Sequence, residues 1–155
     1  MLAFLASGTL GLAWAAGMGR ILGVDARDAR RVVLLLGLLA LLPYAFAAFP
    51  TDPGERGVTA AGRLHLATFA VYAISLPVVL LSIAAIMRRD PRWARSAGPT
   101  RLLGAVLAAA ILLVPVTLYG PLLPWLGLLE RVYVALPSVW QLAVAGTGLR
   151  RLGHF

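Results

Sequence analysis

Apolar residues fill five long runs of the chain, and short polar segments separate these runs. The apolar runs are Leu2–Gly19, Val32–Phe49, Leu64–Met87, Leu102–Gly120 and Leu126–Leu149. A helix of about 20 apolar residues crosses the ~30 Å hydrocarbon core of a bilayer, and it pairs its backbone polar groups within the segment. The pattern therefore predicts an all-α, polytopic transmembrane bundle with five spans, built as a single transmembrane domain over residues 1–155.

The composition supports a membrane protein and argues against a soluble one. Of the 155 residues, 61% are hydrophobic and 13% are charged, and the mean hydropathy is +0.89. A soluble domain of this size cannot bury so much apolar surface. The net charge of +8 does not indicate a nucleic-acid partner, because the basic residues lie in the breaks between apolar runs. The chain has no cysteine, which excludes disulfides and thiol chemistry.

Arginine is distributed unevenly over alternate breaks. Eleven of the 14 arginines lie in the first break, the third break and the C-terminal tail. The three on the other side are Arg56, Arg63 and Arg131. Cytoplasmic loops of membrane proteins carry the excess of positive charge. The sequence therefore predicts a multi-pass protein of the cytoplasmic membrane, with a cytoplasmic C-terminus and with the N-terminus of this chain outside.

Small residues and prolines predict how the spans pack. Ser7, Gly8, Gly11 and Ala15 give the first span a small face that suits close packing on a neighbouring helix. Proline has no N–H, so inside a helix it leaves the carbonyl four residues earlier without its helix partner. Pro77, Pro115 and Pro137 lie inside the third, fourth and fifth predicted spans, and for Pro77 the affected carbonyl is that of Ala73.

Two spans carry a stripe of polar residues. Successive residues of a helix are about 100° apart, which places one set of side chains within about 100° of arc on the third span and another within about 80° on the fifth. These sets are His65, Thr68, Tyr72, Ser75 and Ser82, and Glu130, Ser138 and Gln141. Polar side chains in lipid usually turn toward other helices, so both stripes are expected to face inward.

The polar residues at the outer ends of these spans suggest a small pocket that opens to the outer leaflet. His65 is the candidate general base, and a weak candidate metal ligand, with Asp52 or Glu130 orienting it. The candidate ligand-binding residues are Arg131, Tyr72, Ser75, Tyr119, Trp125, Ser138 and Gln141. The structural alternative is that His65 caps or links helix ends, and that "PTDPG" is simply a turn in which Thr51 or Asp52 caps the next helix.

Three segments give the chain a resemblance to a known family. They are "AAFPTDPGERGVTAAGRLHL", "RRDPRW" and "GLLERVYVALPSVWQLAVAG". With Phe49–Asp52, Gly62, His65, Glu130 and Arg131 as the most specific positions, the chain resembles the bacterial and archaeal integral-membrane family called domain of unknown function 998. Members of that family look like six-helix proteins, so the resemblance implies a chain that lacks the first helix. The family name implies no activity.

The sequence supports a function class rather than a reaction, and any cofactor is unknown from it. The first expectation is a lipid- or small-ligand-binding or structural membrane subunit with an outward-facing polar pocket. One alternative is a membrane-embedded hydrolase acting on lipid at the outer leaflet, and another is a small oligomeric transporter. The expected partners are membrane lipids, together with a second copy of the chain or another membrane protein, and no nucleic acid.

Overall fold

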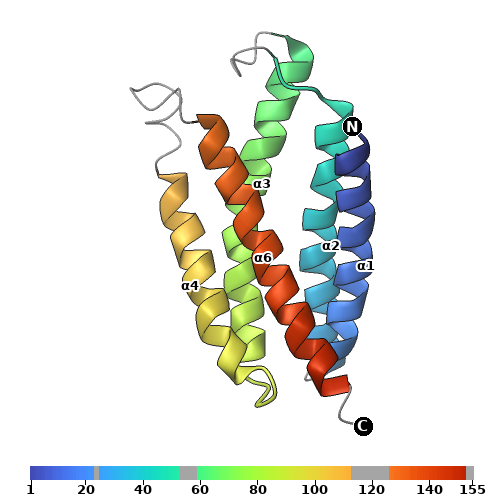
Figure 1. Cartoon of the computed structure of the whole chain (residues 1–155), viewed down its shortest axis with the longest axis vertical. Coiled ribbons are helices and arrows are strands. Elements are labelled where there is room, and N and C mark those ends of the chain that lie inside the picture. The colour runs from blue at the N-terminus through green and yellow to red at the C-terminus, as the bar shows by residue number, and fades with distance from the viewer. Residues whose placement is uncertain (23–24, 53–58, 113–125, 153–155) are drawn as a thin grey trace.

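Every regular element in the described part of the chain is an α-helix. The computed structural model describes residues 1–22, 25–52, 59–112 and 126–152, with side chains left out at 126, 127, 129, 130, 151 and 152. The helices are α1 (Leu2–Ile21), α2 (Ala26–Ala48), α3 (Ala60–Met87), α4 (Ala94–Ile111) and α6 (Leu126–Leu152). They form one bundle in which each described helix runs opposite to the one before it (Figure 1). The predicted all-α bundle is confirmed.

Four stretches of the described helices are long and apolar enough to cross a membrane: α1, α2, α3 and Arg131–Arg150 of α6. They match four of the five predicted spans, with starts and ends that shift by a few residues. For the fourth predicted span, Leu102–Gly120, residues 113–120 lie outside the described residues. The chain is therefore a multi-pass membrane protein by the length and composition of its helices.

The start of α4 corrects the sequence-based prediction. The segment from Arg88 to Arg101 was expected to be a loop, whereas α4 already begins at Ala94. Its buried positions are spaced as one face of a helix, and this face packs on α3. These positions are Ala97, Thr100, Gly104 and Leu107. Burial of this stripe outweighs the loop signal of the glycine and proline at positions 98 and 99, both of which are exposed.

Glycines allow α1 and α2 to pack closely, as the small face of the first span predicted. A Cβ added at Gly11 would lie 2.9 Å from Ala40 Cβ, and one at Gly8 would lie 2.6 Å from the Tyr44 ring. Both separations are too short for real carbon atoms, so only glycine fits at this helix pair. Tyr44 also shares a 2.9 Å hydrogen bond with Thr9 across the same interface.

α3 supplies much of the core, and two side chains of α6 hydrogen bond to the α3–α4 pair. Tyr133 donates a 2.7 Å hydrogen bond to the Ala73 carbonyl, and Trp140 Nε1 donates a 2.8 Å hydrogen bond to Thr100 Oγ1. All four residues are buried. These bonds fix α6 to the bundle at two depths, because each joins a side chain of α6 to a partner on α3 or α4.

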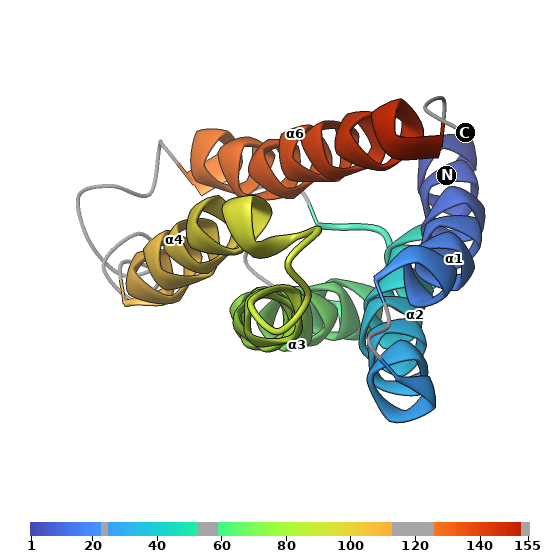
Figure 2. The same ribbon diagram turned by 90° about the horizontal axis from the view of Figure 1, so that it is seen from below.

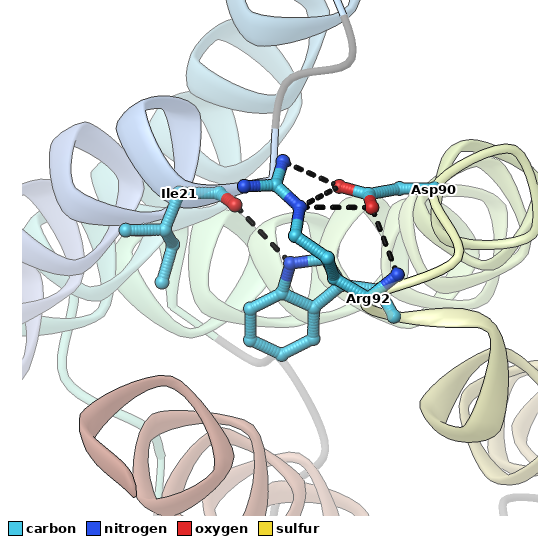
Figure 3. A network of polar contacts seen from close by, with 4 residues as sticks. Ile21, Asp90 and Arg92 are labelled. Carbon is cyan, nitrogen blue, oxygen red and sulfur yellow. Dashed lines mark hydrogen bonds and ion pairs between the residues drawn. The ribbon is translucent and has the colours of Figure 1, made fainter. Parts of the chain in front are cut away.

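One end of the bundle, the arginine-rich end, is where α1, α3 and α6 finish and where α2 and α4 start (Figure 2). Arg89 extends from the end of α3 to the buried Asp28 near the start of α2, at 3.2 Å. Asp90 accepts from the Arg92 guanidinium and from its backbone N–H (Figure 3). The pKa of the Arg92 guanidinium is raised, chiefly by its side-chain hydrogen bond to Asp90 and secondly by the negative charge of Asp90.

Trp93 connects the α3–α4 turn to α1 at the same end. Its indole Nε1 donates a 3.1 Å hydrogen bond to the carbonyl of Ile21, the last residue of α1 (Figure 3). The last carbonyls of a helix have no partner within it, so this bond satisfies a group that the helix leaves open. The side chain is almost fully buried. It joins the end of α1 to the turn between α3 and α4.

Candidate functional site

Asp52 organises the start of α3, at the end of the bundle opposite the arginines, which we call the Asp52 end. Its Oδ2 accepts from the backbone N–H of Thr59 at 2.8 Å, and its Oδ1 accepts from the Thr59 hydroxyl at 2.7 Å. The Thr59 Oγ1 in turn accepts from the backbone N–H of Gly62, which makes Thr59 the N-cap of α3. A Cβ at Gly62 would collide with the Asp52 carboxylate. The acid therefore closes the loop between α2 and α3.

His65 links the same two helices. Its Nδ1 donates a 2.8 Å hydrogen bond to the carbonyl of Phe49, the C-cap of α2. Its ring packs edge-on against Phe46, with 5.1 Å between the ring centroids. Asp52 and His65 lie in one local structure, but the hydrogen bonds described for them go to Thr59 and to Phe49 respectively. This geometry matches the structural alternative drawn from the sequence.

Three of the other residues predicted for the outer pocket lie outside what the structure describes. Glu130 lies on α6 and its side chain is outside the described residues, as are Tyr119 and Trp125 entirely. Arg131 is exposed near the start of α6. Among the residues that are described, no three His, Cys, Asp or Glu side chains come together in a way that could hold a metal ion.

A cavity of about 590 Å³ lies deeper in the bundle, between the α1–α2 pair and α6. This volume falls within the ~300–1,000 Å³ that is usual for small-molecule sites. The lining is mostly apolar, extends over four helices and, among the described residues, contains no charged side chain. It runs along α1 from Ala3 to Trp14, α2 from Leu36 to Pro43, α3 at Tyr72 and Leu76, and α6 from Val134 to Ala145.

The cavity lies where α1 and α6 diverge, because the contacts described between them are at mid-bundle, where Trp14 meets Trp140, and at the arginine-rich end. At the arginine-rich end, a Cβ at Gly148 of α6 would lie 3.2 Å from Ile21 Cδ1 at the end of α1. The two helices then separate toward the Asp52 end, where α6 lies beside α4 instead (Figures 1 and 2). The cavity is accordingly a half-open wedge. Exposed lining residues such as Ala6 and Leu142 lie on its two sides.

The wedge is elongated along the helices. On α1, Trp14 follows Ala3 by eleven positions, and on α6, Ala145 follows Val134 by eleven positions. At 1.5 Å per residue, each wall is about 17 Å long. This is roughly half of the ~30 Å hydrocarbon core. The wedge thus reaches from near the first residue of α1 to the middle of the bundle.

A few polar groups lie in this apolar lining: Ser7, Trp14, Tyr72, Ser138 and Gln141. The Ser138 hydroxyl donates to the Val134 carbonyl of its own helix at 3.1 Å. Trp14 packs edge-on against Trp140, with 6.5 Å between the ring centroids, and its Nε1 is buried with no hydrogen-bond partner in the described structure. The wedge therefore has an unused donor in its wall.

Sequence reasoning identified part of this site and missed the rest. Tyr72, Ser138 and Gln141 were candidate ligand-binding residues and all three line the wedge, whereas Ser75 from the same set does not. Thr68 and Ser82 donate to carbonyls of their own helix and so need no inward partner. Ser7 and Trp14 were not candidates. A serine and a tryptophan within an apolar run do not indicate from the sequence that a cavity forms beside them.

The comparisons with known proteins bear on the family and not on the activity. A family model described as "Protein of unknown function (DUF998)" matches residues 1–147. No curated protein and no solved structure matches the chain. The match covers nearly the whole chain, including the three segments that carry the resemblance and the four helices that line the wedge. The chain belongs to the DUF998 family of membrane proteins of unknown function.

Proposed function

We propose that the protein binds the acyl chain of a membrane lipid in the wedge between α1 and α6. The observation that carries this proposal is a half-open cavity of about 590 Å³, inside a bundle of membrane-spanning length, whose described lining residues are all uncharged. Such a cavity favours an apolar occupant, because a charged group there would lose its water without gaining a partner.

The dimensions of the wedge support a chain rather than a compact molecule. Its ~17 Å walls match about one leaflet of the hydrocarbon core. Exposed lining residues such as Ala3, Ser7 and Leu142 flank the opening, so a lipid enters sideways from the bilayer without first crossing water. The protein thus acts as a lipid-binding membrane subunit.

The distribution of arginine supports one orientation in the cytoplasmic membrane. Eleven arginines belong to the arginine-rich end, and by the positive-inside rule this end lies in the cytoplasm. The N-terminus of the chain is then outside, and the wide part of the wedge faces the outer leaflet. We assign no reaction, because the hydrogen bonds of Asp52 and His65 favour a structural role for both residues.

Photolabelling with a phospholipid that carries a diazirine in its acyl chain tests this proposal in nanodiscs. The expected result is labelling of residues 3–14 and 134–145 that saturates as the labelled lipid is increased, because a site has a limited capacity. Exposed positions outside the wedge, such as Leu102 and Val106 on α4, should be labelled in proportion to the lipid. Proportional labelling at every position would overturn the proposal.

A pair of alanine variants on α1 provides the control. Ala6 lines the wedge and is exposed, whereas Ala16 is exposed but does not line it. Ala6→Phe should fill the wedge and abolish the saturable labelling, and Ala16→Phe should leave it unchanged. Equal effects of the two variants would contradict a site at the wedge.

A further inference from the structure

The deep end of the wedge contains hydrogen-bonding groups that the fold itself does not use. Gln141 lines the wedge and lies ten residues after Arg131 and nine before Arg150, at the middle of the apolar part of α6. Its amide makes no hydrogen bond to another described residue. Polar side chains at the middle of a membrane span are costly and usually have a partner. We therefore expect the Gln141 amide to hydrogen bond to a group that the described residues do not supply.

Trp14 adds a second unused group at the same depth. It lines the wedge at the last lining position on α1, and its indole Nε1 is buried without an acceptor among the described residues. Its ring lies against Trp140, one residue before Gln141 in the chain. A buried donor without a partner costs about 1–3 kcal/mol, which favours an acceptor that the protein does not itself supply.

Resting on the proposed lipid site, we propose that the bound molecule carries an uncharged oxygen, a carbonyl or a hydroxyl, to the depth of Gln141, where the Gln141 amide donates to it. Trp14 Nε1 supplies a second donor when its ring turns toward the wedge. A plain hydrocarbon leaves both groups unused. A carboxylate or phosphate is disfavoured, because none of the lining residues that the structure describes is charged and the desolvation of the anion would not be offset.

Competition against the diazirine-labelled phospholipid tests this assignment with three probes of equal chain length: an alkane, a methyl ketone and a fatty acid anion. The concentration of each probe in the membrane is measured, so that differences in partitioning between water and membrane do not affect the comparison. In the wild type, the ketone should displace the label at a roughly three- to tenfold lower concentration than the alkane, which is what one interior hydrogen bond contributes. The anion should do no better than the alkane.

Variants identify the residue that recognises the oxygen. Gln141→Leu should bind the alkane as the wild type does and should lose the preference for the ketone. Trp14→Phe keeps an aromatic ring, removes the N–H and should reduce the preference. Ser138→Ala is the matched control, because the Ser138 hydroxyl already donates to its own helix, and it should keep the full preference.

The outcomes separate the two proposals. If the ketone and the alkane compete equally in the wild type, the lipid site stands and the recognition by Gln141 is wrong. A ketone preference that survives Gln141→Leu unchanged also overturns it. If none of the probes displaces the label at the wedge, the proposed lipid site itself fails.

Discussion

The hydroxyl of Tyr133 on α6 donates a 2.7 Å hydrogen bond to the carbonyl of Ala73 on α3. Pro77 lies four residues after Ala73 within the same helix. Because proline has no N–H, this carbonyl has no regular helix partner. The proline thus creates the acceptor to which α6 is attached, and the pair explains how a helix break becomes a contact between helices.

Tyr133→Phe should lower the free energy of unfolding by about 1–2 kcal/mol, because it leaves a buried carbonyl unsatisfied. The measurement is unfolding in mixed micelles, followed by circular dichroism. The same substitution in a Pro77→Ala background should cost less, since the backbone N–H of the introduced alanine then bonds to the Ala73 carbonyl. Equal costs in the two backgrounds would contradict the link between the proline and the tyrosine.

Gly62→Ala should destabilise the protein by about 1–3 kcal/mol, because a Cβ at this position collides with Asp52 and displaces it from Thr59. Gly37→Ala is the matched control, since a Cβ at Gly37 meets no atom within 4 Å. That variant should be neutral or should stabilise α2 by up to about 1 kcal/mol, through the higher helix propensity of alanine. Thermal unfolding of the two variants distinguishes them, and a Gly62→Ala variant as stable as the wild type would show that Asp52 does not close the loop.

His65→Ala should cost about 1 kcal/mol of stability through the lost hydrogen bond to Phe49. It should leave acyl-chain labelling at the wedge unchanged, because His65 does not line it. Arg63→Ala, an exposed neighbour on α3, should change neither quantity. A His65→Ala variant that folds with unchanged stability but loses labelling would instead favour a functional role for the histidine.

Much of the fold could be predicted because hydropathy alone requires it. Runs such as Leu64–Met87 are too long and too apolar for anything but a membrane helix, and α3 follows that run closely. The start of α4 could not be predicted in this way. Glycine and proline at positions 98 and 99 are typical loop residues, and the contacts that favour a helix here, such as those of Thr100 and Gly104 with α3, come from distant parts of the chain.

The candidate site was only partly predictable, for a related reason. The polar stripes placed Ser138 and Gln141 on one face of a helix, which periodicity can do. Whether that face meets another helix or a cavity depends on the angle between α1 and α6, which is set by contacts such as Gly148 with Ile21. No single-sequence pattern encodes that angle. The hydrogen bonds of Asp52 to Thr59 and of His65 to Phe49 could not be read from the sequence, because they depend on how the chain folds back between α2 and α3.

The orientation can be measured with single cysteines, because the chain contains none. Gly57→Cys, between α2 and α3, should react with a membrane-impermeant maleimide in intact cells. Arg95→Cys, near the start of α4, should react only after permeabilisation. The reverse pattern would place the arginine-rich end outside and turn the wide part of the wedge toward the inner leaflet.

The central claim is that a lipid chain occupies the wedge, and native mass spectrometry of the detergent-solubilised protein tests it most directly. The wild type and Ala16→Phe should each retain one lipid per chain at collision energies that strip loosely attached lipid, and Ala6→Phe should retain none. Loss of lipid from all three proteins at the same energy, or equal retention by Ala6→Phe, would contradict a lipid-binding wedge between α1 and α6.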